Sequence, residues 1–405
     1  MALTPEYLGK VPKNIVALYQ ELEDFIIEDF SRRLAKVGNI TDTGKWQIMR
    51  AKEFGMSSET LKKKIAEVSN LSDKEIDKIF RQSAIDSINM DNAIYEQAKL
   101  TPMHLETSPV LQQYLEAAVI QTKGELKNLT QSLGFCVRGV NGKVKNRKLT
   151  EYYQHALDLT QFQISSGVLD YNTAIRRAIK DISDSGVRFI NYESGYHNRI
   201  DVAVRRATLT GVNQMSNRIT TFLMNELECE YVEVSAHAGA RPSHQEWQGQ
   251  VYCRKGSTKE YKNFEDATGY GTGEGLCGWN CRHSFFPFFP GISSRTYTEE
   301  DLKNIDPPNI RYKGKVYTHY EATQRQRQIE TRIRATKREL IGYNAIDDKE
   351  AFTQASIKLQ RQKQEYKKFS KVANLKMQNE RMQEFGFNKS VAQKAVIKQD
   401  FLFCP

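Results

Sequence analysis

Helical periodicity is the feature that most constrains the fold of this chain. In the segment NIVALYQELEDFIIEDFSRRLAKVG, apolar side chains recur every three or four residues, at Ile15, Leu18, Tyr19, Leu22, Phe25 and Ile26. This spacing places an apolar stripe on one side of an α-helix and charged residues on the other. Similar patterns continue to about residue 150, so residues 1–150 are predicted to form a helical N-terminal region.

Local signals indicate where several of these helices begin. Thr4 and Ser108 each precede a proline, and a hydroxyl N-cap followed by proline at the first helical position is a typical helix start. Ser72 and Glu75 have the spacing of a capping box, which predicts a further helix start just before IDKIFRQSAIDSI. Nothing in these helices indicates catalysis.

The middle of the chain, residues 151–300, has a mixed pattern. TEYYQHALDLTQF and NTAIRRAIKDI have helical spacing, and a long amphipathic helix is expected over 200–226. VRFINY and EYVEVSAH have the composition and alternation of short strands. SFFPFF is expected to be an edge strand or extended segment, because Pro287 cannot donate to a central ladder, with Phe285 and Phe288 on different faces. The predicted class is therefore α+β, with a small mixed central domain.

The last segment, residues 301–405, is expected to be basic and helical. Ile329, Ile333 and Leu340 share one stripe, and after the break GYNAIDD a heptad register begins at Phe352, which predicts a helical hairpin or short coiled coil. Residues 311–399 contain 21 Lys and Arg against 9 Asp and Glu, whereas the whole chain has a net charge of +10. The basicity is thus confined to this segment.

A basic block beside a near-neutral body indicates a polyanionic partner such as double-stranded DNA, or else a solvated Lys-rich face that also joins copies of the chain. The densest basic group is expected to surround one helix and to contact phosphates without sequence preference. Its members are Arg325, Arg327, Arg332, Arg334, Lys337 and Arg338.

A cluster of metal-ligand residues lies between positions 237 and 283. Of the chain's six cysteines and seven histidines, six fall in this window. Cys and His side chains hold zinc tetrahedrally, often as two close pairs. The predicted zinc ligands are His244, Cys277, Cys281 and His283, with His237 and Cys253 as substitutes. The alternative is that the cysteines are buried as small apolar residues and the histidines form ordinary hydrogen bonds.

A zinc deaminase and a phosphate-binding loop are weaker interpretations. His244 and Glu246, followed by the later cysteine pair, partly resemble the zinc deaminase signature, in which a glutamate moves protons beside the metal. However, Cys277 and Cys281 are separated by three residues rather than two, and the prolines that follow prevent the helix this fold requires. GYGTGEG lacks the Lys-Ser/Thr of a P-loop and is expected to be an ordinary loop.

Three separated motifs, VSAHAGARPSHQEWQGQVY, GLCGWNCRHSFFPFFPG and YEATQRQRQIETRIRATKREL, resemble in this order the minor capsid protein 2 family of tailed bacteriophages. The chain resembles more distantly the Mu F-like head morphogenesis proteins. In that wider pattern an early Cys or His pair precedes Asn-Cys-Arg-Cys; here Asn280-Cys281-Arg282-His283 matches with a histidine in the last place, and His244 lies in the early element.

The resemblance implies a structural, non-enzymatic virion protein with no catalytic residues. It implies few copies per virion, located inside the head at the portal vertex after assembly in the host cytoplasm. Portal and major capsid subunits are the implied partners, and the N-terminal helices are expected to contact them. The protein is also expected to take part in DNA packaging or ejection. No run of about 20 apolar residues is present, so no membrane span is expected.

Overall fold

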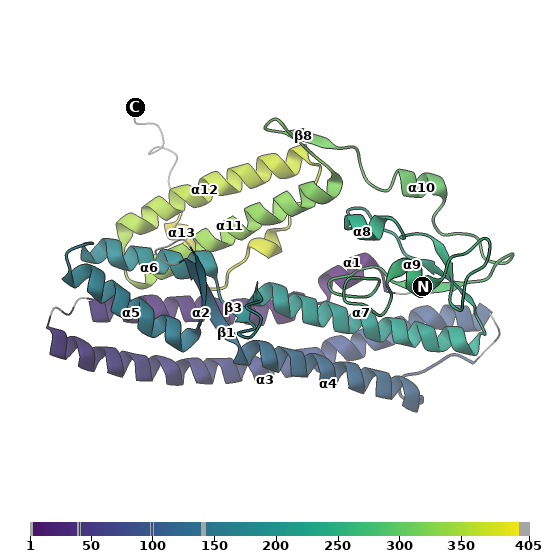
Figure 1. The fold of residues 1–405 in the computed structure, drawn as a ribbon, viewed down its shortest axis with the longest axis horizontal. Coiled ribbons are helices and arrows are strands. Elements are labelled where there is room, and N and C mark those ends of the chain that lie inside the picture. Colours follow the sequence, from purple (N-terminus) through teal and green to yellow (C-terminus); the bar gives the residue numbers. More distant parts are fainter. Residues whose placement is uncertain are drawn as a thin grey trace. The chain divides into compact units, whose positions relative to one another are not determined.

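The computed structural model describes residues 3–38, 40, 42–97, 99, 101–138 and 143–396 and confirms the predicted α+β class (Figure 1). Its contacts define two compact units. Unit 1 comprises Met1–Val16, Leu71–Lys127 and Val204–Thr323; unit 2 comprises Ala17–Asn70, Asn128–Ala203 and Gln324–Pro405. The three consecutive segments expected from the sequence do not coincide with these units, because each unit combines three separate stretches of chain.

The first six helices contain the segments before residue 186 that were predicted to be helical. They are α1 (Pro5–Lys10), α2 (Lys13–Gly38), α3 (Thr43–Gln97), α4 (Pro109–Gln131), α5 (Leu149–Ser165) and α6 (Tyr171–Ser185). The Thr4 hydroxyl accepts a hydrogen bond from the Tyr7 backbone N–H at 3.2 Å, and the Ser108 hydroxyl accepts one from Leu111 at 3.4 Å. Both predicted N-caps are therefore confirmed.

The predicted helix start at Ser72 is wrong. Ser72 is buried inside α3, which continues unbroken for 55 residues. The buried side chains of Val68, Ile76 and Phe80 extend the apolar stripe on both sides of this position. Burial of that stripe stabilises a continuous helix more than a local cap would stabilise a break.

Unit 2 contains a four-stranded antiparallel sheet and a helical hairpin. The sheet has the order β2-β1-β3-β4, formed by β1 (Leu133–Arg138), β2 (Val144–Lys148), β3 (Arg188–Ile190) and β4 (His197–Arg199). Its third strand lies in the predicted segment VRFINY. On β1, Phe135 is buried against Tyr152 of α5, with ring centroids 4.9 Å apart.

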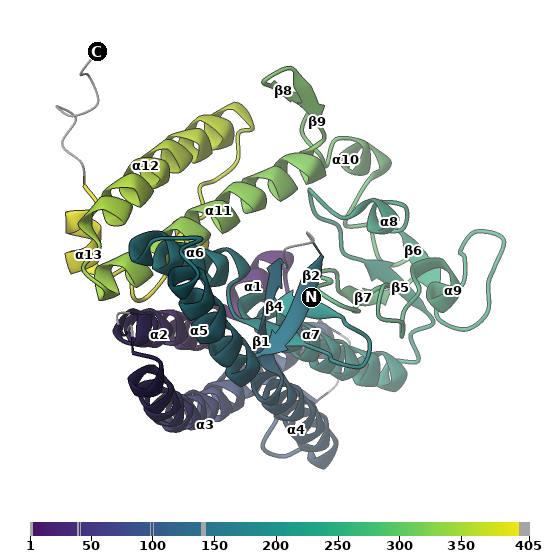
Figure 2. The same cartoon turned by 60° about the vertical axis from the view of Figure 1, so that its left-hand side comes forward.

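The predicted C-terminal hairpin is formed by α11 (His319–Ala345) and α12 (Lys349–Val372), which run side by side in both views (Figures 1 and 2). The Tyr366 hydroxyl donates to Glu330 at 2.9 Å, and Lys358 donates to Glu339 at 2.7 Å, so the two helices pack antiparallel. Two short elements follow, the 3-10 helix η1 (Asn379–Met382) and α13 (Lys389–Lys394). The apolar segment FLFCP lies outside the described residues.

Unit 1 contains a small three-stranded sheet and the part of the long helix α7 (Ile200–Glu226) that begins at Val204. The antiparallel sheet has the order β6-β5-β7. The other elements after α7 are β5 (Tyr231–Val234), α8 (Pro242–Gln245), β6 (Val251–Cys253), α9 (Phe264–Thr268), β7 (Phe285–Phe288), α10 (Glu299–Lys303), β8 (Ile310–Tyr312) and β9 (Lys315–Tyr317).

The strand β7 is an edge strand, as its proline predicted. Phe285 and Phe288 are both buried, whereas Phe286 is only half-buried. Phe285 packs against the rings of Phe264 and Tyr270, with centroids 5.0 and 5.3 Å away. The core of this unit also contains Met224, Val232, Val234, Trp247, Tyr252, Leu276, Cys277 and Cys281.

Candidate metal centre

Three of the four predicted zinc ligands converge in the core of unit 1. The Nδ1 atoms of His244 and His283 lie 3.4 Å apart, and the Cys281 Sγ lies 3.8 Å from the first and 3.6 Å from the second. All three side chains are buried. Among the described residues, this is the group of histidine, cysteine and acidic side chains whose ligand atoms meet closely enough to hold one metal ion.

Short, irregular segments position these side chains. His244 lies in the one-turn helix α8, which begins at Pro242, where proline at the first helical position is favourable. Cys281 and His283 lie in the turn segment that leads into β7. This segment folds back on itself: the Trp279 backbone N–H donates to the Gly273 carbonyl at 2.7 Å. A Cβ at Gly278 would collide with that same carbonyl, so glycine is required there. GYGTGEG is thus a loop, as predicted.

The outer nitrogens of both imidazoles have fixed partners. The Nε2 of His244 lies 2.9 Å from the Glu274 backbone oxygen, which can only accept a hydrogen bond, so this Nε2 carries the proton. The Nε2 of His283 lies 3.1 Å from the Gln248 Oε1, which also accepts from the His237 backbone N–H. This second bond fixes the orientation of the amide, so the Nε2 of His283 also donates. Both Nδ1 atoms are then unprotonated and face the Cys281 thiol.

Burial keeps both rings neutral. It lowers the pKa of His244, and it lowers the pKa of His283 well below the usual value, with further contributions from His237, His244 and the guanidinium groups of Arg282 and Arg241. Neutral imidazole is the form that binds metals. The triad can therefore hold a metal ion through two nitrogens and one sulfur.

Side chains around the triad fix it in place. The Nδ2 of Asn213, on α7, donates to the backbone oxygens of Cys281 and His283 at 3.2 and 3.1 Å. The indole of Trp247 packs against His244 and against the edge of His283, with ring centroids 4.4 and 4.9 Å away. Sequence reasoning missed Asn213 and Gln248, since a polar residue in a helix or loop carries no signal of what it contacts.

The remaining predicted ligands lie outside the triad. The Cys277 Sγ is buried next to it and points at the His283 backbone oxygen, 3.7 Å away. The ring of His237 stacks on His283 at 4.3 Å, and its Nδ1 lies 3.0 Å from the Ala238 oxygen. Cys253, on β6, donates to the Lys255 oxygen at 3.1 Å. The structure does not bring these two substitute ligands to the triad.

The predicted basic group around α11 is only partly exposed. Arg334 and Arg338 are buried and paired with carboxylates, and Arg325 pairs with Glu365 at 2.9 Å. Lys337 is half-buried and donates to the Met382 oxygen. Arg327 and Arg332 are exposed. Arg334 and Arg338 therefore cannot contact phosphates in this structure.

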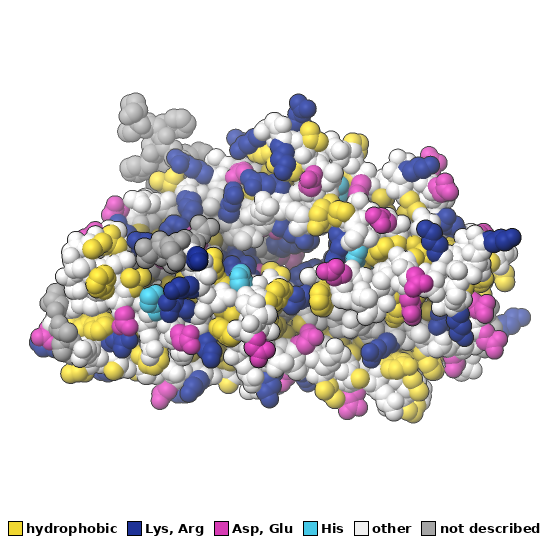
Figure 3. Space-filling view, viewed as in Figure 1, with side chains coloured by type: hydrophobic (Ala, Val, Ile, Leu, Met, Phe, Trp, Pro, Cys, Tyr) yellow, Lys and Arg dark blue, Asp and Glu magenta, His cyan; other side chains and the backbone are white. Residues whose placement is uncertain are grey.

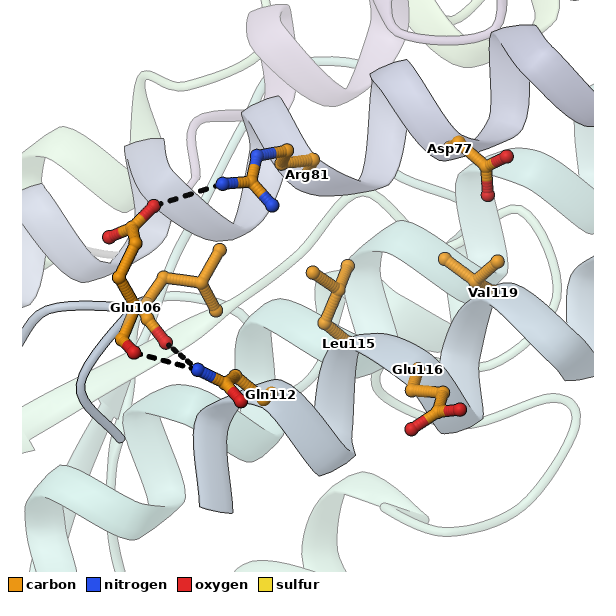
Figure 4. Close-up of a pocket in the computed structure, with 8 residues that line it drawn as sticks. Asp77, Arg81, Glu106, Gln112, Leu115, Glu116 and Val119 are labelled. Atoms are coloured by element: carbon orange, nitrogen blue, oxygen red, sulfur yellow. Dashed lines mark hydrogen bonds and ion pairs between the residues drawn. The ribbon is translucent and has the colours of Figure 1, made fainter. Parts of the chain in front are cut away.

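The enzyme alternative gains no geometric support. Glu246, the residue a deaminase would need beside its metal, is exposed, and Cys281 is followed by the strand β7 rather than a helix. A groove of about 430 Å³ lies between α3 and α4, and Figure 4 shows its lining. Arg81 pairs there with Glu106 at 3.1 Å, and none of the lining residues belongs to the triad.

The sequence as a whole matches one family. The family model described as phage minor capsid protein 2 covers residues 3–371. The chain therefore belongs to the phage minor capsid protein 2 family, as its motifs predicted. It is a structural protein of the phage capsid, located in the virion and in contact with other virion components. No curated protein and no solved structure matches it. In the described part of the chain, no helix has the length and apolar character needed to cross a membrane.

Proposed function

We propose that this protein is a low-copy component of the head interior at the portal vertex. The observation that carries the proposal is the family match over residues 3–371. Exposed apolar side chains on the N-terminal helices, including Ile48 (73% exposed) and Ile120 (63% exposed), suit contact with portal or major capsid subunits. Portal-vertex density for this chain in averaged virions, with a copy number far below that of the major capsid protein, is the expected result. An even distribution over the capsid shell would contradict it.

The surface that contacts packaged DNA is, in this proposal, one face of α12 rather than the predicted group on α11. Its members are Arg361, Lys363, Lys367, Lys368 and Lys371, all exposed. At about 100° per residue, they fall within an arc of about 160°. Among the residues that the structure describes, none of these five forms an ion pair with a carboxylate. Figure 3 shows Lys and Arg side chains on the surface where α12 lies.

Phosphate contacts of this kind depend steeply on salt, because each one releases counterions. Full-length protein is expected to bind duplex DNA of any sequence at low salt. Replacing Arg361, Lys367, Lys368 and Lys371 by glutamine should weaken binding and reduce the salt slope by about 0.9 for each phosphate that the variant no longer neutralises. The matched control replaces four exposed lysines of α3, Lys62, Lys63, Lys74 and Lys78, with the same change in net charge. Equal effects of the two variants would contradict a specific role for α12.

The metal proposed for the His244, Cys281 and His283 triad is zinc. Zinc bonds of about 2.0–2.1 Å to nitrogen and 2.3 Å to sulfur, arranged tetrahedrally, separate two nitrogens by about 3.3–3.4 Å and nitrogen from sulfur by about 3.6 Å. The observed separations are 3.4, 3.6 and 3.8 Å. Ligand histidines typically donate their second N–H to an oxygen, as both rings do here. Without a cation, a single S–H would face two lone pairs and could satisfy only one.

Elemental analysis of purified protein is expected to give about one zinc per chain. Cys281→Ser should lose most of it. Cys253→Ser is the matched control, because that thiol is also buried in unit 1 but bonds only to a backbone oxygen. Equal zinc content in both variants would contradict the assignment.

A further inference from the structure

We propose that Cys277 is the fourth zinc ligand, which makes the centre a closed Cys2His2 site without an exchangeable water. This inference rests on the zinc site proposed above and goes beyond it. It assigns the centre a structural rather than a hydrolytic role, since catalytic zinc keeps one position open for water or substrate.

The position of the Cys277 thiol favours this assignment. The sulfurs of Cys277 and Cys281 lie 3.7 and 4.0 Å from the same atom, the His283 backbone oxygen, so the Cys277 thiol is close to the triad. The contacts of Cys277 are weak, because a thiol is a poor donor. Its side chain has one heavy-atom torsion, and a change to another staggered rotamer moves the sulfur by roughly 3 Å while the backbone stays in place.

His237 does not fit the fourth position. Its ring lies 4.3 Å from that of His283 with an angle of 22° between the planes. A metal bound to the Nδ1 of His283 lies in the plane of that ring. The ring of His237 is nearly parallel to that of His283 and displaced from it. The lone pairs of its nitrogens lie in its own plane, so they do not point at the metal.

A water molecule in the fourth position would have few polar partners among the side chains cited. A buried water needs two to four polar partners. Around the triad, the amide oxygen of Gln248 already accepts two hydrogen bonds, and the amide nitrogen of Asn213 donates to two backbone oxygens. Trp247 packs on both histidines, and the buried cluster that contains Cys281 also includes the apolar side chains of Leu276 and Phe285.

Charge balance gives an independent reason. Zinc with two neutral imidazoles and one thiolate keeps a net charge of about +1, which is costly in a buried site. Arg241 and Arg282 add positive charge nearby: Arg241 donates to the Trp279 backbone oxygen, and the Nη2 of Arg282 lies 3.5 Å from the Nδ1 of His237. A second thiolate, from Cys277, makes the centre neutral.

The test is cobalt(II) binding to the full-length apoprotein at neutral pH. Two thiols release two protons when they bind the metal, and neutral histidines release none. Wild type is expected to release two protons per cobalt and Cys277→Ser one, with the thiolate-to-cobalt absorption halved. Cys253→Ser is the control and should behave like wild type.

The outcomes separate the two proposals. Wild type that binds no metal would overturn the zinc site itself. Metal binding with one proton released, and a Cys277→Ser spectrum unchanged from wild type, would overturn only the role of Cys277. If Cys277→Ser does not fold, X-ray absorption of the zinc-loaded wild type still decides, because two sulfurs bonded to zinc are expected and one would contradict the inference.

Discussion

Arg338 and Glu23 form an ion pair in which neither side chain has any exposed surface. The Nη1 of Arg338 lies 3.2 Å from the Glu23 Oε2 and 3.0 Å from Glu384, and its Nε donates to the Ser183 backbone oxygen at 3.0 Å. Arg334 adds pairs to both carboxylates and to Asp201. These charges stabilise one another inside unit 2, because each would be strongly destabilising if left alone there.

Arg338→Ala is therefore expected to destabilise the protein by about 3–5 kcal/mol, since it leaves buried carboxylates undercompensated. Urea unfolding measures the change. Arg332→Ala, an exposed change on the same helix, is the control and should stay within about 0.5 kcal/mol of wild type. Equal stability of the two variants would show that the buried pairs are not required.

These buried arginines show which features of the fold could be predicted from the sequence and which could not. The apolar stripe of α11 and the hairpin were predictable, because helical periodicity is local. Which arginines are buried was not predictable, because their acidic partners lie far away in sequence, at Glu23 and Asp201. A run of like charges thus indicated basic side chains around one helix that all contact phosphates, whereas the fold divides them between an ionic core and exposed positions.

The metal centre was also predictable only in part. Residue chemistry and density predicted that His244, Cys281 and His283 would meet. The positions of His237 and Cys253 depend on ring stacking and on strand β6, which spacing alone does not determine. The length of α3 could not be predicted for another reason. Ser72 and Glu75 satisfy a local capping rule, but burial of a longer apolar stripe stabilises a continuous helix more strongly.

Asp91 is expected to make stability depend on pH. Burial raises the pKa of this carboxyl to about 7, although the Thr220 hydroxyl donates to it at 3.2 Å. In the unfolded chain an aspartate has a pKa of about 3.9. Between about pH 4 and 7 the folded state thus holds a proton that the unfolded state has lost, so stability falls as pH rises, by up to about 1.4 kcal/mol per pH unit.

Asp91→Asn removes this titration, so the difference in stability between pH 4.5 and pH 7 should shrink. Asp73→Asn, which changes an exposed carboxylate, should leave the pH dependence unchanged. Urea midpoints across this range provide the measurement. A wild-type slope that persists in Asp91→Asn would assign the effect to other groups.

Phe285 is expected to be the critical ring of the SFFPFF segment. It is 1% exposed and packs edge-on against Phe264 and Tyr270. Phe285→Ala should destabilise the protein by about 3–5 kcal/mol, because it removes the ring and leaves a cavity. Phe286→Ala, one residue further along the strand, should have a clearly smaller effect because that ring is half-buried. The reverse order in thermal unfolding would mean that the register of β7 is different.

Asn213 is expected to act as a positioning residue for the metal centre. Its amide holds the backbone of both Cys281 and His283, and its own Oδ1 accepts from the Nδ2 of Asn217 at 2.8 Å. Loss of such supporting contacts typically weakens metal affinity by about 10–100-fold. Asn213→Ala should therefore bind zinc more weakly in competition with a chromophoric chelator, while still binding one ion per chain. Gln214→Ala, the adjacent half-buried position, is the control.

A general loss of folding would lower the unfolding midpoint of zinc-saturated Asn213→Ala as much as that of its apo form. A positioning role instead predicts that saturating zinc restores most of the difference from wild type. Unchanged zinc affinity in Asn213→Ala would show that the ligand backbone is held without α7.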